Sequence, residues 1–90
     1  MKNRENIIEN MKQFTQGQDG LAVSKTYTRE DHLIIYITRN EEWDTDDIIK
    51  FKQDLNRWKF FDDYVIGIGN LGDGTLIIQV FNKDDITIWR

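Results

Sequence analysis

The chain of 90 residues contains no cysteine and no proline, and it has one serine and one histidine. Without cysteine it can form neither a disulfide scaffold nor a thiolate zinc site. No apolar run approaches the ~20 residues that a membrane-spanning helix needs, and the N-terminal stretch is too polar for a signal peptide. These absences predict a soluble protein, most simply a cytoplasmic one, that does not enter a membrane.

The scarcity of serine and histidine also limits nucleophilic catalysis. Ser24 and His32 are expected in neighbouring strands and could lie near each other, but no nucleophile elbow or oxyanion loop surrounds them. Adjacent acids such as Asp62 and Asp63 are typical of helix ends and turns, not of a catalytic pair facing across a cleft. The sequence therefore predicts a protein that is not an enzyme and that holds no cofactor.

The residues that are present indicate one folded domain. Hydrophobic residues make up 39% of the chain and aromatic residues 12%, which excludes a disordered sequence. A chain of this length supports a single small core, so residues 1–90 are predicted to form one domain.

Apolar residues spaced three and four apart predict two helices. The first covers residues 3–14. The second begins at Thr45, the natural N-cap with which Asp44 competes, and it ends at Asp62 and Asp63. The stripes expected to pack on a sheet are Ile7, Met11 and Phe14 in the first helix and Ile48, Phe51, Leu55 and Trp58 in the second.

Runs of apolar and β-branched residues predict five strands, at residues 21–28 and 32–39, in a hairpin over Tyr64–Phe81, and at Ile86–Arg90. The expected fold class is α+β, with the order α-β-β-α-β-β-β. It has a mainly antiparallel sheet of about five strands and two helices packed on one face. Strict alternation along the first strand would place Leu21, Val23, Lys25 and Tyr27 on one face of that sheet.

Glycines are concentrated in the stretch GIGNLGDG, whose letters match a dinucleotide-binding fingerprint. That fingerprint opens a helix after a parallel strand, whereas a β-rich run follows here, so nucleotide binding is not predicted. A hairpin that pairs Asn70 with Thr75 would instead place Gly67 and Gly69 on one face as a shallow trough. We expect the second helix to fill this trough; a ligand groove is the alternative.

An acidic run is the first candidate for a binding site. It carries five acids and no base, and its candidate partner-binding residues are Glu41, Glu42, Trp43, Asp44, Asp46 and Asp47. An exposed Trp43 among carboxylates would suit contact with a basic protein surface; alternatively, Trp43 packs on the core and the acids are simply solvated. These acids also offer oxygen ligands for a divalent ion, but their spacing does not match a calcium loop, and no metal site is predicted.

A basic flank on the second helix is the second candidate. Its members, the alternative nucleic-acid-binding residues, are Lys50, Lys52, Arg57 and Lys59. Strand aromatics could stack on bases if one sheet face is open; these are Tyr27, Tyr36, Tyr64, Phe81 and Trp89. The net charge of −4 argues against general nucleic-acid binding, and a mixed-charge helix face is ordinary.

Together these features predict a small non-enzymatic protein-interaction module that binds an unknown protein partner through the acidic Trp-containing loop. Size and composition resemble those of phage or mobile-element inhibitors and of immunity-type proteins, and a nucleic-acid-binding module is the alternative function. A homodimer through a short edge strand such as Ile86–Arg90 is compatible with the sequence as well.

Overall fold

The computed structural model describes residues 3–18, 20–30 and 32–83. Its elements are α1 (Arg4–Gln16), β1 (Ala22–Arg29), β2 (His32–Thr38), α2 (Thr45–Asn56), the 3₁₀ helix η1 (Lys59–Asp63), β3 (Tyr64–Gly72) and β4 (Thr75–Asn82). The α+β class is confirmed. The described residues form four strands, and the fifth strand predicted at Ile86–Arg90 lies outside them.

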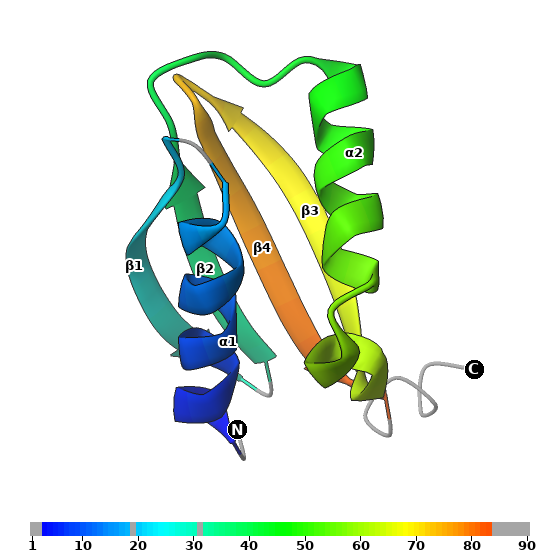
Figure 1. Cartoon of the computed structure of the whole chain (residues 1–90). Coiled ribbons are helices and arrows are strands. Elements are labelled where there is room, and N and C mark those ends of the chain that lie inside the picture. Colours follow the sequence, from blue (N-terminus) through cyan, green and yellow to red (C-terminus); the bar gives the residue numbers. More distant parts are fainter. Residues whose placement is uncertain (1–2, 19, 31, 84–90) are drawn as a thin grey trace, which may run out of the picture.

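All four strands belong to one antiparallel sheet in the order β1-β2-β4-β3. The central strands are therefore β2 and β4, which carry the longest apolar runs, as expected of strands with neighbours on both sides. Both helices lie over the same face of the sheet, with α1 near β1 and β2 and α2 near β3 (Figure 1). No helix within the described ranges is long and apolar enough to cross a membrane.

The core lies between the helices and this covered face. Its strand residues come from alternate positions of β2 and β4, because successive side chains of a strand point to opposite faces. The buried members are Ile7, Met11 and Phe14 of α1, Leu33, Ile35 and Ile37 of β2, Phe51 and Leu55 of α2, Leu76, Ile78 and Val80 of β4, and Trp43 and Phe61 from the connections. Both predicted helix stripes thus pack on the sheet, as expected.

A β-bulge changes the faces of β1. The register shifts between Val23 and Lys25, so Val23 pairs with Ile37 while Lys25 pairs with Tyr36. Val23 consequently packs against the core, whereas Lys25 and Tyr27 lie on the opposite face. The prediction that Val23, Lys25 and Tyr27 share one face is wrong, because an extra residue in a strand reverses the alternation beyond it.

A second bulge shifts the β3–β4 hairpin by one residue. Asn70 pairs with Leu76 instead of Thr75, and Gly72 takes Thr75 as its partner. Gly67 and Gly69 therefore pair with Gln79 and Ile77, and they lie on the face that the helices do not cover. The prediction that the second helix fills a trough at Gly67 and Gly69 is wrong, because a one-residue slip in register moves every side chain of the strand to the other face.

The second helix is shorter than predicted. Asp44 is its N-cap and accepts a hydrogen bond from the backbone N–H of Asp47 at 2.8 Å, so Thr45 is already helical. The helix ends at Asn56 rather than at Asp62, and residues Lys59–Asp63 form the separate helix η1. Trp58 lies between them in extended conformation and donates its indole N–H to Asn10 Oδ1 at 2.9 Å. This contact ties the end of α2 to α1.

Candidate functional site

Trp43 of the acidic run is held in place by Gly74, Asn70, Phe51 and Arg39, a set of contacts that we call the Trp43 clamp. This side chain is only 6% exposed, and its indole N–H donates to the carbonyl oxygen of Gly74 in the β3–β4 turn at 2.9 Å. Its own carbonyl accepts a hydrogen bond from Asn70 Nδ2 at 3.2 Å, and its ring packs edge-on against Phe51 of α2. Of the two alternatives for Trp43, the structure shows the packed one, so the loop offers no exposed aromatic anchor.

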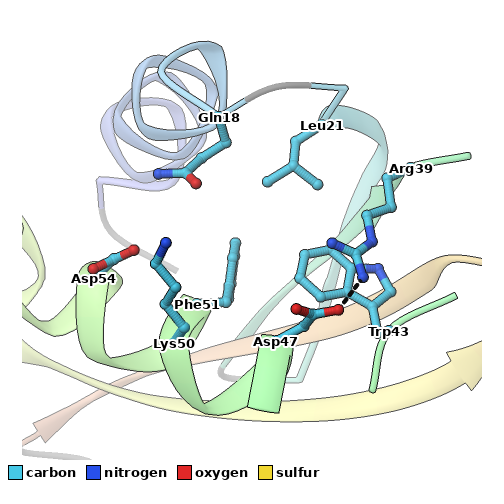
Figure 2. Close-up of a pocket in the computed structure, with 8 residues that line it drawn as sticks. All are labelled: Gln18, Leu21, Arg39, Trp43, Asp47, Lys50, Phe51 and Asp54. Atoms are coloured by element: carbon cyan, nitrogen blue, oxygen red, sulfur yellow. Dashed lines mark hydrogen bonds and ion pairs between the residues drawn. The ribbon is translucent and has the colours of Figure 1, made fainter. Parts of the chain in front are cut away.

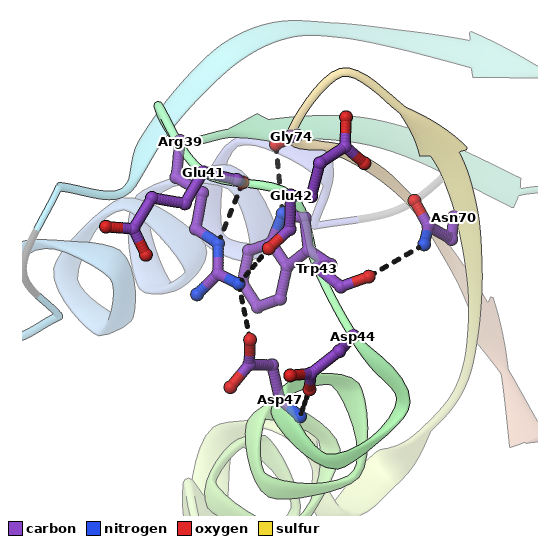
Figure 3. A network of polar contacts seen from close by, with 8 residues as sticks. All are labelled: Arg39, Glu41, Glu42, Trp43, Asp44, Asp47, Asn70 and Gly74. Carbon is purple, nitrogen blue, oxygen red and sulfur yellow. Dashed lines mark hydrogen bonds and ion pairs between the residues drawn. The ribbon is translucent and has the colours of Figure 1, made fainter.

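Arg39 holds the same loop from its other side (Figure 3). Its guanidinium lies 3.9 Å from the centre of the Trp43 ring and donates to the carbonyl oxygens of Glu41 and Glu42. It also forms an ion pair with the Asp47 carboxylate at 2.6 Å. Sequence reasoning did not single out Arg39, although it is the last base before a run of five acids.

Much of the negative charge of the loop is therefore engaged within the protein. The Arg39 hydrogen bond lowers the pKa of Asp47, and bonds from Asp44 add to this effect. Asp44 caps α2, and Glu42 Oε1 accepts the backbone N–H of Asp73 at 3.0 Å. Glu41 and Asp46 are the exposed acids of the loop whose side-chain carboxylates make no hydrogen bond or ion pair within the described chain.

A shallow hollow of about 140 Å³ lies beside this clamp (Figure 2). Leu21, Trp43 and Phe51 give it an apolar lining, while Arg39, Asp47, Lys50, Asp54 and Gln18 supply its polar groups. Arg39 and Asp47 are already bonded to each other there, and Asp54 faces Arg57 at 3.6 Å. The hollow is smaller than a typical ligand pocket, and both signs of charge are balanced around it.

The four basic residues of the second candidate do not form one patch. Lys50 and Lys52 are two positions apart on α2, which separates them by about 200° around the helix. Arg57 is the C-cap of α2, and Lys59 belongs to η1. All four side chains are exposed, on elements of the helix layer, away from the open side of the sheet. A phosphate backbone would meet separate cations here, interspersed with Asp46 and Asp54.

The uncovered side of the sheet is the most distinctive surface. We call it the open sheet face; its central residues are Lys25 and Tyr27 of β1, His32, Ile34 and Tyr36 of β2, Ile77, Gln79 and Phe81 of β4, and Val65, Gly67 and Gly69 of β3. Ile34 is only 1% exposed although no helix of the described residues covers this side, so the side chains around it already exclude water. Tyr64, by contrast, packs on the helix side against Phe60 and Phe61.

Aromatic rings dominate this face and contact one another. His32 stacks on Phe81 with ring centres 4.4 Å apart, and the Tyr27 and Tyr36 hydroxyl oxygens lie 3.4 Å apart. The Lys25 ammonium lies 4.6 Å from the centre of the Tyr36 ring. The hydrogen bond with Tyr36 raises the pKa of Tyr27. The bulge in β1 places Tyr27 on the same face of the sheet as Tyr36.

The residues that could carry chemistry are not assembled. Ser24 lies at the bulge of β1, whereas His32 pairs with Arg29 at the other end of the hairpin. Five residues of strand, about 17 Å, separate Ser24 from that pair, so Ser24 and His32 do not lie near each other. Within residues 3–18, 20–30 and 32–83, no group of three or more histidine, aspartate or glutamate side chains is placed to hold a metal ion.

Comparison with protein-family models, with curated proteins and with solved structures found no match to this chain.

Proposed function

We propose that the protein is a small non-enzymatic interaction module and that it binds a protein partner on the open sheet face. One observation carries this proposal: within the described residues, the four-stranded antiparallel sheet has helices on one face only, while the other face presents the rings of Tyr27, Tyr36, His32 and Phe81. Tyrosine is enriched at the centres of protein interfaces, because it buries a large area and loses little conformational entropy.

The charge around this face favours a protein partner over a nucleic acid. The face has few cations: Lys25 lies over the Tyr36 ring, and Arg29 lies at the end of β1. The whole chain carries a net charge of −4, which repels phosphate groups at long range. An aromatic surface with few charges matches the core of a protein interface, where charged residues are depleted.

Binding alone is enough for a protein of this kind to act. A partner seated on the sheet would have the matching part of its own surface covered, which is how inhibitors and immunity-type proteins work without catalysis. The exposed carboxylates of Glu41 and Asp46 would add polar contacts to the same partner. Trp43 would not take part in those contacts, because it is buried.

Affinity capture from the source cell tests the proposal with matched variants. Tyr27→Ser with Tyr36→Ser removes two rings from the open sheet face, and we expect it to abolish recovery of a partner that the parent chain captures. Gln53→Ser with Lys50→Ser changes the exposed side of α2 instead and should leave recovery unchanged. Partner recovery that survives the tyrosine changes would refute the open face as the binding surface.

A second pair of variants distinguishes the contribution of the acidic loop to binding from that of the open sheet face. Glu41→Lys and Asp46→Lys reverse the charge of the two exposed acids whose carboxylates make no internal contact, and they leave the Trp43 clamp intact. We expect a modest loss of affinity that depends on salt, because charges at the rim of an interface chiefly affect the association rate. Complete loss of capture by this pair alone would place the main contact in the loop.

Nucleic-acid binding remains a second candidate because Tyr27, Tyr36 and Phe81 share an open antiparallel sheet with Lys25. Exposed sheet aromatics stack on the bases of single strands in several RNA-binding domains. Titration with a single-stranded oligonucleotide at low salt distinguishes the two functions. Amide shifts on the open sheet face that weaken as salt increases would favour this candidate over a protein partner.

A further inference from the structure

The two outer edges of the sheet are protected very differently. Strand β1 carries Lys25, Arg29 and a bulge at Ser24, features that natural edge strands use to prevent pairing with other chains. Strand β3 has nine residues from Tyr64 to Gly72 with neither charge nor proline, and its bulge lies only at the turn end. Among the described strands it pairs only with β4, so no described strand pairs with its outward-facing backbone groups.

Exposed apolar side chains lie near both ends of β3 and on α2. Val65 and Leu71 of β3 are 39% and 54% exposed. Ile49, 49% exposed, lies on α2 about 150° around the helix from Asp47 and Asp54, which face the hollow beside Gln18. Ile49 therefore lies on the flank of α2 turned away from α1, the side on which β3 forms the edge of the sheet (Figure 1).

We propose that the edge of β3 binds an extended strand of a partner protein, which joins the sheet as an additional strand. Free backbone N–H and C=O groups at a strand edge are matched by another extended backbone, and the apolar residues beside them favour an apolar centre in that strand. This edge borders the open sheet face along β3, but it binds through backbone groups in the plane of the sheet, whereas the open face binds through side chains that project from it.

Charge at the two ends of β3 defines the partner strand further. Asp62 and Asp63 come directly before it, and Asp73 lies in the turn after it. A partner strand with basic residues at both ends therefore complements this edge. A second copy of the chain does not, because full antiparallel pairing of β3 with itself would bring Asp63 of one copy beside Asp73 of the other.

A designed peptide tests the site in the intact chain. The probe is a blocked peptide with an alternating Thr–Val centre about as long as the nine residues of β3 and with lysines at both ends. Its control carries glutamates in place of the lysines. We expect the lysine peptide to shift the backbone amides of residues 64–72 and to slow their hydrogen exchange, with the amides of β1 unchanged, and the glutamate peptide to bind more weakly.

Removal of the negative charges at the two ends of β3 tests their contribution to the affinity for the lysine peptide. Asp62→Asn, Asp63→Asn and Asp73→Asn in one chain should weaken the lysine peptide by about threefold to tenfold, in line with exposed ion pairs. Asparagine tolerates the left-handed backbone of Asp73, so the turn is expected to persist. Glu5→Gln with Glu9→Gln on α1 is the matched control and should leave the affinity unchanged.

Four results would overturn the proposal. The first is the absence of binding up to millimolar peptide, and the second is amide shifts confined to β1, β2 and β4. The third is a dimer in sedimentation whose formation shifts the β3 amides without peptide, which would make a second copy the occupant. The fourth is contact between residues 84–90 and β3 in the protein alone, which would make the chain itself the occupant.

Discussion

The indole N–H of Trp43 and the backbone N–H of Arg39 both donate to the carbonyl oxygen of Gly74, each at 2.9 Å. One carbonyl in the β3–β4 turn thus joins the end of β2 to the loop that leads into α2. The Trp43 carbonyl oxygen accepts a hydrogen bond from the side-chain amide of Asn70, near the end of β3. The acidic loop is consequently part of the folded core at this end of the sheet.

Alanine substitution at two turn glycines tests this junction. A Cβ at Gly74 would collide with the carbonyl oxygen of Arg39, whereas a Cβ at Gly72 meets nothing within 4 Å. Both glycines have positive φ, so each substitution has a backbone cost of about 1–2 kcal/mol. In urea unfolding we expect Gly74→Ala to lose clearly more stability than Gly72→Ala, and equal losses would contradict the close packing of the turn against Arg39.

Removal of the Trp43 N–H isolates its hydrogen bond. Trp43→Phe keeps an aromatic ring near Phe51 but leaves Gly74 with one donor fewer, for an expected loss of about 1–3 kcal/mol in the free energy of unfolding. Trp58→Phe is the matched control, because its N–H partner Asn10 is partly exposed and can bind water instead. A smaller loss at Trp43 than at Trp58 would refute the clamp.

The ion pair of Arg39 with Asp47 predicts a pH dependence of stability. The pKa of Asp47 is lowered in the folded state, so its contribution is present above its unfolded pKa of about 3.9 and disappears as the pH falls through the folded value. Asp47→Asn should therefore melt below the parent chain near neutral pH, with the difference vanishing in strong acid. Melting curves recorded across this range check it; a difference that persists at about pH 2 would show that the charge is not responsible.

Valine substitution of the two β3 glycines tests the observed register. A Cβ at Gly69 would approach Cγ2 of Ile77 to 2.9 Å, whereas one at Gly67 would make ordinary contact with Gln79. We expect Gly69→Val to lose about 1–3 kcal/mol, and Gly67→Val to change stability by less than about 1 kcal/mol. The reverse order of losses would favour the register that pairs Asn70 with Thr75.

The spacing and type of neighbouring residues were sufficient to predict the helix stripes, the β1–β2 connection and the β3–β4 turn. Ile7, Met11 and Phe14 pack where the helical repeat predicts, because amphipathic spacing depends only on the local period of the helix. The α+β class followed from the order of such segments. The candidate sites were harder to predict, since Trp43 is hydrophobic and charged neighbours do not show whether it points inward or outward.

The sequence by itself determined that the chain folds as an α+β protein, and it located both helices, the four described strands and their hairpin turns, although not the end of the second helix. Tertiary structure decided which face each strand residue occupies, because the bulges near Ser24 and Leu71 shift the alternation by one and leave no clear mark in the sequence. It also decided that Trp43 is buried and that β3 is an edge strand, since both depend on contacts between residues distant in the chain. The surfaces proposed for binding follow from those contacts.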